Sequence, residues 1–159
     1  MKLENEPSLE DVFKAVGAPE AYKEVVFCGY GEPTVRFELM KQIAKGLKEK
    51  GAKKIRLNTD GLASLAEGRD VTEELKGLID SVSISLNAHN AEVYKDVCPS
   101  KYGENAHQAI LDFIKSAVKN IKDVTVTAVT IPEVDIKACE KLALSLGAKF
   151  KAREYQKVG

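Results

Sequence analysis

Residues 80–88 read DSVSISLNA, a stretch in which every second side chain is apolar. The apolar residues at 82, 84 and 86 alternate with serine and asparagine, which is typical of a β-strand with one buried and one polar face. A strand that helices cover on both faces would be apolar throughout. The stretch therefore predicts a sheet with helices on one face and water or a polar ligand on the other.

Strand and helix patterns alternate along the rest of the 159-residue chain, in five strands and five or six helices. This order is typical of βα units and of a parallel sheet. With the half-polar strands, it predicts an α/β fold: a partial (βα) TIM-like barrel whose parallel sheet of about five strands has helices on its outer face. Strands are expected at residues 25–28, 54–58, 81–87, 124–129 and 148–153, and helices at 9–17, 34–50, 72–79, 105–119 and 135–146.

The composition narrows the class of protein. The 24 basic side chains are balanced by 24 acidic ones, whereas general nucleic-acid or membrane-surface binders need an excess of positive charge. No apolar run approaches the roughly 20 residues that span a bilayer, and the first residues lack the apolar segment of a signal peptide. We expect one domain over residues 1–159 and a cytoplasmic location.

Three cysteines, Cys28, Cys98 and Cys139, lie far apart in the sequence. A zinc or iron–sulfur site built from one segment needs thiolates a few residues apart, so the chain has no local metal motif. His89 and His107 have no partner at metal-ligand spacing, and we expect both to be solvated. These observations argue against a metal hydrolase, and the odd number of cysteines fits a reducing compartment.

Polar residues follow several expected strands, at the sheet edge where parallel α/β folds bind ligands. Residues 28–33 read CGYGEP, residues 58–61 read NTDG, and residues 85–88 read SLNA. A carboxylate, two amides and several hydroxyls at one edge suit a ligand with an amine and a ribose. Each motif alone is also compatible with an ordinary turn, and no nucleophile and base form an obvious pair.

In combination, these motifs resemble those of the radical S-adenosylmethionine (SAM) enzymes. CGYGEP resembles the family's glycine-glycine-glutamate motif, which implies that Glu32 and adjacent backbone groups bind the SAM amino group. NTDG resembles the end of the following strand, and residues 80–88 resemble the strand that supplies Ser85 and Asn87 to the ribose or carboxylate. The resemblance also implies that Val129 packs beside adenine and that Arg153 meets the substrate or the SAM carboxylate, although Arg153 also fits an ordinary surface position. The SAM-binding set implied in this way is Gly29, Tyr30, Gly31, Glu32, Pro33, Asn58, Asp60, Ser83, Ser85, Asn87, Val129 and Arg153.

More narrowly, four stretches resemble the TatD-linked radical SAM proteins, and the resemblance leaves the substrate unknown. They are residues 25–33, 55–61, 81–88 and 153–159.

The family's cysteine motif, C-x-x-x-C-x-x-C, does not occur in the sequence. In the family its three thiolates hold a [4Fe-4S] cluster that reductively cleaves SAM to a 5′-deoxyadenosyl radical. The resemblance therefore implies a truncated barrel that is inactive by itself and whose full-length form carries the cluster. The alternative is a complete, cluster-free module that binds SAM or a nucleotide, or that docks on a partner.

Two expectations concern the edges of the sheet. Without a preceding strand, residues 25–28 would form an exposed apolar edge, and such an edge favours self-association. Lys149 and Lys151 have two open explanations, because they could face a ligand inside the barrel or protect the opposite edge.

Overall fold

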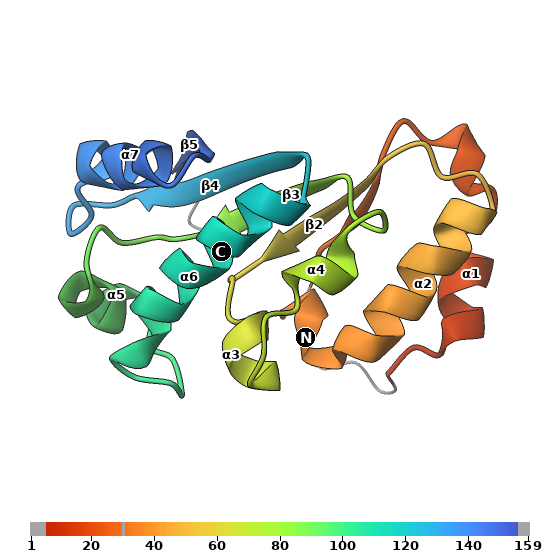
Figure 1. Ribbon diagram of the computed structural model, residues 1–159, viewed down its shortest axis with the longest axis horizontal. Coiled ribbons are helices and arrows are strands. Elements are labelled where there is room, and N and C mark those ends of the chain that lie inside the picture. Colours follow the sequence, from red (N-terminus) through yellow and green to blue (C-terminus); the bar gives the residue numbers. More distant parts are fainter. Residues whose placement is uncertain (1–5, 30, 156–159) are drawn as a thin grey trace.

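The computed structural model describes residues 6–29 and 31–155. Among them, five parallel strands form one sheet whose spatial order follows the sequence, β1-β2-β3-β4-β5. The sheet is open, which confirms the predicted α/β class and partial barrel (Figure 1). The strands are β1 (Val25–Phe27), β2 (Ile55–Thr59), β3 (Ser81–Ser85), β4 (Asp123–Thr130) and β5 (Lys149–Glu154).

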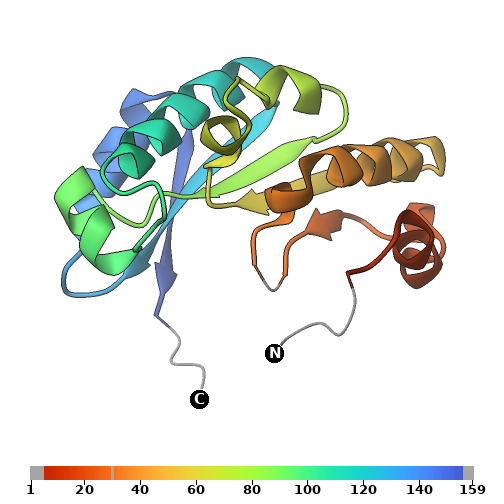
Figure 2. The same ribbon diagram turned by 90° about the horizontal axis from the view of Figure 1, so that it is seen from below.

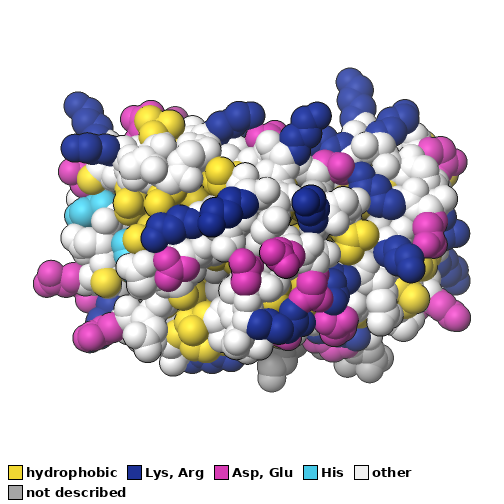
Figure 3. Space-filling model, in the orientation of Figure 1, with side chains coloured by type: hydrophobic (Ala, Val, Ile, Leu, Met, Phe, Trp, Pro, Cys, Tyr) yellow, Lys and Arg dark blue, Asp and Glu magenta, His cyan; other side chains and the backbone are white. Residues whose placement is uncertain are grey.

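The longer helices lie on one face of the sheet, and the other face is open (Figure 2). Helix α1 lies at the β1 end, where it packs against α2. Basic and acidic side chains are interspersed over the helical side (Figure 3). The helices are α1 (Leu9–Val16), α2 (Phe37–Glu49), α3 (Ala63–Glu67), α4 (Thr72–Leu75), α5 (Ala91–Val97), α6 (Asn105–Asn120) and α7 (Ile136–Ser145), with 3-10 turns η1 (Pro19–Ala21) and η2 (Pro33–Arg36).

The core lies between the sheet and the helices. Ile84 of β3 and Val126 of β4 are neighbours in register, and both are fully buried. Ile110 and Phe113 of α6 belong to the same buried cluster. Each such side chain contributes about 1.5–3 kcal/mol through burial, so the alternation in residues 80–88 fixes which face of the sheet the helices cover.

The opposite face is polar, as the alternation predicts. Asn58, Ser83 and Thr125 are register partners on three neighbouring strands, and all three are half-buried. Thr127 and Lys151 continue this surface on β4 and β5. The structure thus has an open, polar sheet face that can accept a ligand.

Three helical segments differ from the sequence-based prediction. Helix α3 lies where a loop was expected, α5 was missed, and α4 ends at Leu75 instead of near residue 79. Helix α5 has a capping residue, Asn90, whose Oδ1 accepts a hydrogen bond from Val93 N at 2.9 Å. Helix α3 has no side-chain cap, and so short a helix gives too few turns for a periodic pattern.

Both ends of the described sheet are edges, as expected for β1 and as one of the two explanations for Lys149 and Lys151 requires of β5. Among the residues that the structure describes, strand β1 pairs only with β2, and β5 pairs only with β4. An apolar groove of about 520 Å³ runs along β1 between α1 and α2, with Val12, Phe27 and Leu39 among its lining residues. No helix among the described residues has the length and apolar character needed to cross a membrane.

Candidate functional site

Glu32 is the centre of a hydrogen-bond network at the carboxyl end of the sheet. Its Oε1 accepts hydrogen bonds from Thr34 N at 3.0 Å, Thr34 Oγ1 at 2.7 Å and Thr59 Oγ1 at 2.8 Å. Its Oε2 accepts one from Asp60 N at 2.7 Å. These bonds tie the loop after β1 to the end of β2. Oε1 thus accepts three hydrogen bonds and Oε2 accepts one, so Oε2 is the oxygen that has room for a ligand donor.

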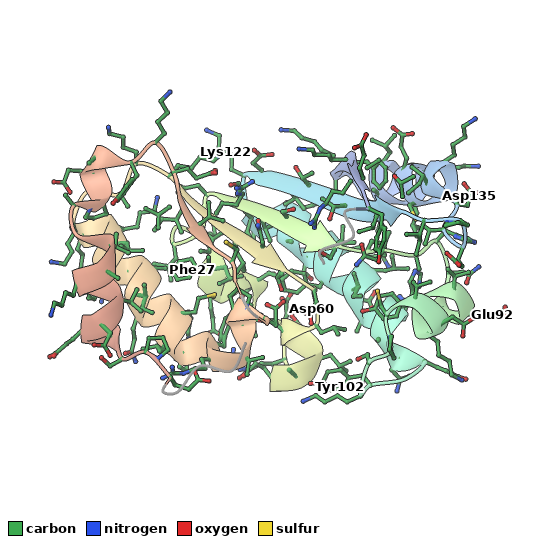
Figure 4. The ribbon with its side chains drawn as sticks, turned by 180° about the vertical axis from the view of Figure 1, so that it is seen from behind. Phe27, Asp60, Glu92, Tyr102, Lys122 and Asp135 are labelled. Carbon is green, nitrogen blue, oxygen red and sulfur yellow. The ribbon has the colours of Figure 1, made fainter. Side chains whose placement is uncertain are left out.

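Asp60 lies just beyond the end of β2 (Figure 4), and its backbone N contacts Glu32. Its Oδ1 accepts a hydrogen bond from Leu62 N at 2.9 Å. Burial raises the pKa of Asp60, and the nearby negative charge of Glu32 raises it further. Two adjacent carboxylates repel each other, and a cation placed between them relieves that repulsion. The pair therefore suits a positively charged ligand group.

The loop between β1 and η2 presents its backbone at the same edge. Gly31 has φ 96°, a conformation that favours glycine. A Cβ built there would meet no atom within 4 Å, so the backbone conformation, and not crowding, requires the glycine. Gly29 is exposed, and Pro33 begins η2. Tyr30, the remaining predicted residue of this loop, lies outside the described residues.

Asn87 lies two residues beyond β3 and has φ 55°, a left-handed conformation that asparagine adopts more readily than most non-glycine residues. Its backbone N donates to Thr127 O at 3.3 Å, and its Nδ2 donates to Cys98 Sγ at 3.7 Å. The Oδ1 is buried and has no hydrogen-bond partner. Most buried acceptors are paired, so this oxygen is available to a hydroxyl of a ligand. Ser85 is half-buried two residues earlier.

Behind Asn87, helices α5 and α6 form a packed wall. The rings of Tyr94 and His107 have centroids 6.0 Å apart, and His107 Nε2 lies 3.2 Å from Ala88 O. His107 is buried, and burial lowers its pKa, so the ring is neutral at pH 7. The expectation that this histidine is solvated is wrong, because α5 covers it. His89 is half-buried and accepts a hydrogen bond from Asp135 N at 3.3 Å.

Three other predicted residues, Asn58, Ser83 and Arg153, line a hollow on the open sheet face. This hollow, called the polar cavity below, has a volume of about 330 Å³. Val129 is the register partner of Arg153 and is half-buried. The polar cavity is lined by Glu24, Lys54, Arg56, Asn58, Ser81, Val82, Ser83, Asp123, Thr125, Thr127, Lys151 and Arg153.

The predicted set therefore divides into two groups. Glu32 and Asp60 are in direct contact at the carboxyl edge, whereas Asn58, Ser83 and Arg153 line the polar cavity. Thr34, Thr59 and Thr127 are among the hydroxyl residues that the sequence places at the strand ends, but they are not in the predicted SAM-binding set. Thr34 and Thr59 hold Glu32, and the Thr127 hydroxyl is buried without a partner. Threonines at strand ends and on the polar side of an alternating strand were the signal that could have identified them.

The described residues do not form a metal centre. They contain no group of three His, Cys, Asp or Glu side chains that could hold a metal ion. Cys28 is exposed after β1, Cys98 is half-buried after α5, and Cys139 is buried in α7. Burial raises the pKa of Cys139 to about 11, so this thiol is protonated at neutral pH. These three cysteines do not fit a [4Fe-4S] cluster.

Comparisons with known proteins give one finding. The family model described as the radical SAM superfamily matches residues 2–146. This range includes β1 to β4, the Glu32 network and Asn87. A comparison with curated proteins finds no match.

Proposed function

Because this chain belongs to the radical SAM superfamily, we propose that the carboxyl edge of its sheet binds SAM. The observation that carries the proposal is the contact between Glu32 and Asp60. The backbone N of Asp60 donates to Glu32 Oε2, and the two carboxylates are close enough for the charge of Glu32 to raise the pKa of Asp60. Thr34 and Thr59 hold the Glu32 carboxylate of this pair, and its Oε2 has room for a further hydrogen bond. SAM carries an ammonium and a sulfonium, so its cationic end matches this pair.

Most of the other predicted residues complete the proposed site. Gly29, Gly31 and Pro33, with Tyr30 between the glycines, would shape the loop beside the amino group. Asn87 would accept from a ribose hydroxyl through its unpartnered Oδ1, with Ser85 beside it. Val129 would pack against adenine. Asn58, Ser83 and Arg153 line the polar cavity, apart from the carboxylate pair, where Arg153 would meet the substrate.

In this superfamily, bound SAM supplies radical chemistry after one-electron reduction by a [4Fe-4S] cluster. The three cysteines of this chain do not fit that cluster, so we propose that other thiolates hold it in the full-length, active protein. The contribution of the present residues is to bind and orient SAM. We further propose a relationship to the TatD-linked members, with an unknown substrate, and a cytoplasmic location, where the free cysteines remain reduced.

The scattered cysteines also favour a second candidate function. A cluster-free module could bind SAM or a nucleotide at the same edge, or dock on a partner, without catalysis. The mass and N-terminal peptide of the protein as the cell makes it distinguish the two candidates. A longer product with three closely spaced cysteines supports the enzyme, and a product that matches residues 1–159 supports the module.

The test of the SAM site is isothermal titration calorimetry with SAM. Glu32→Gln and Asp60→Asn each remove one negative charge from the pair, and each should weaken binding about tenfold or more, since a hydrogen bond to a charged group contributes roughly 1.5–3 kcal/mol. Glu140→Gln, at an exposed position on α7, is the control of equal charge. Far-UV circular dichroism and urea denaturation establish that each variant is folded.

The Asp60→Asn variant keeps the proposal testable if Glu32→Gln destabilises the fold. An asparagine Oδ1 can still accept from Leu62 N, so the local turn is retained. If both folded variants bind SAM as the wild type does, the assignment of the carboxylate pair is wrong. If SAM binds neither to this chain nor to a cluster-containing form, the SAM site itself is wrong.

A further inference from the structure

The polar cavity contains buried polar atoms that the protein itself leaves without partners. Ser81 and Thr127 are 4% and 3% exposed, and neither Ser81 Oγ nor Thr127 Oγ1 has a hydrogen-bond partner. Asn58 Oδ1 is also buried and unpartnered. All three residues line the same hollow. Buried polar groups are normally hydrogen-bonded, so a cluster of unpartnered ones indicates that a ligand or water completes them.

The charge of the cavity wall indicates what kind of ligand fits. Four basic and two acidic side chains line the polar cavity, in a chain with no net charge. Glu24 lies 3.1 Å from Lys54 and 3.3 Å from Arg56. Lys151 and Arg153 form no ion pair with any side chain in the described part of the molecule. They are therefore the two basic side chains of the cavity that have no acidic partner among the described residues.

The register places these cations beside the unpartnered hydroxyl. Thr127 of β4 is the direct partner of Lys151, and Val129 is the partner of Arg153. Strands in a sheet lie about 4.8 Å apart, so the Thr127 hydroxyl and the two basic groups can contact the same ligand. A hydroxyl and two cations are donors to an oxyanion.

Lys149, on the same strand, has a different environment. It does not line the cavity, and its Nζ pairs with Asp123 Oδ1 at 2.8 Å. Edge protection explains an exposed charge at the start of the edge strand, such as Lys149. It does not explain why two further cations line a cavity that contains unpartnered hydroxyls.

We propose that the polar cavity binds the substrate through an anionic group, a phosphate or a carboxylate, held by Lys151, Arg153 and the Thr127 hydroxyl. This inference rests on the proposed function, because it assigns the ligand as the substrate of the SAM-dependent enzyme. Asn58 Oδ1 requires a donor, so the substrate also carries a hydroxyl or an amine near its anionic group. The polar cavity and the carboxylate pair thus have opposite charge and bind different molecules.

The test is an NMR titration of the folded chain with inorganic phosphate and, separately, with succinate. The backbone amides of Thr127 and Lys151 should shift saturably. The anion that binds more tightly identifies the preferred group. Lys151→Gln combined with Arg153→Gln should weaken binding at least about tenfold, because charge-assisted bonds are lost. Lys137→Gln combined with Lys141→Gln, at exposed positions on α7, makes the same charge change and should leave binding unaltered.

Further measurements separate the competing explanations. Thr127→Val keeps the shape of the side chain and should weaken anion binding if the hydroxyl contacts the ligand. Absence of saturable shifts, or an equal loss of anion affinity in both double variants, would overturn the inference.

Calorimetry with SAM on the same samples should give unchanged SAM affinity in the variant that combines Lys151→Gln with Arg153→Gln. A parallel loss of SAM affinity would instead assign Arg153 to the SAM carboxylate. Phosphate or succinate binding without any SAM binding would overturn the proposed function and leave an anion site.

Discussion

At the scale of single residues, one carboxylate organises the carboxyl edge of the sheet. Glu32 accepts hydrogen bonds from two threonines and from the backbone of Asp60. Asp60 is partly buried next to this carboxylate, which carries a charge of the same sign as its own. Its pKa is therefore raised, by burial first and by Glu32 second.

The raised pKa of Asp60 predicts a pH dependence of stability. The folded state binds this proton more tightly than the unfolded state, so the contribution of Asp60 to stability is lost as the pH rises through its folded pKa. Asp60→Asn removes the charge and should be more stable than the wild type at neutral pH. The difference should vanish below pH 3.8, the ordinary pKa of the group. Urea denaturation of both proteins, from neutral pH to below pH 3.8, measures the difference in their free energies of unfolding. A difference that stays constant with pH would contradict the raised pKa of Asp60.

The same group predicts how ligand binding depends on pH. A cation beside the carboxylate pair favours the ionised form of Asp60, so binding releases a proton near its folded pKa. SAM affinity should therefore fall as the pH is lowered through that value. Calorimetry of wild type and Asp60→Asn tests this, because the variant should lose this component of the pH dependence. An identical pH profile in the two proteins would show that Asp60 does not face the cation.

At the scale of elements, the connection from β2 to α3 sets the shape of the edge. Asp60 accepts from Leu62 N, and Gly61 between them has φ 80°. A Cβ on Gly61 would lie 2.9 Å from Ile84 Cγ2 and 3.3 Å from Ile110 Cγ2. Glycine is thus required both for the backbone conformation and for the close approach of this turn to the core.

Two glycine variants separate these two requirements. Gly61→Ala should lower the free energy of unfolding by about 2–4 kcal/mol, from the left-handed conformation and from overpacking. Gly68→Ala, at φ 66° with no atom within 4 Å of the added Cβ, should lower it by only about 1 kcal/mol. Urea denaturation gives both values. Equal losses would mean that the core beneath Gly61 can adjust freely.

At the scale of the whole molecule, the two edges of the sheet differ in character. The β5 edge carries Lys149, Lys151 and Arg153, which are all exposed. The β1 edge is apolar and adjoins the groove of about 520 Å³ between α1 and α2. Charges discourage strand addition at a sheet edge, whereas an apolar unpaired strand favours it. The β1 edge is therefore the side at which another strand would be added.

We predict that the chain self-associates through β1. Sedimentation velocity should show a concentration-dependent increase in mass, and Val26→Lys should reduce it by placing a charge on the edge. Leu144→Lys, at a 58% exposed position on α7, is the control and should associate like the wild type. A wild-type protein that remains monomeric over the whole concentration range would contradict this prediction.

The sequence alone determined the fold class, the covered face of the sheet and the motifs at its carboxyl edge. Periodicity is local, so the alternation in residues 80–88 was sufficient to predict a sheet with one polar face. Tertiary structure decided which of those polar residues meet. Thr59 holds Glu32 across 27 positions of sequence, α5 covers His107, and Thr127 comes into register with Lys151. Hydrogen bonds and burial between distant segments depend on how strands pair and helices pack, and no local pattern in the sequence specifies these contacts.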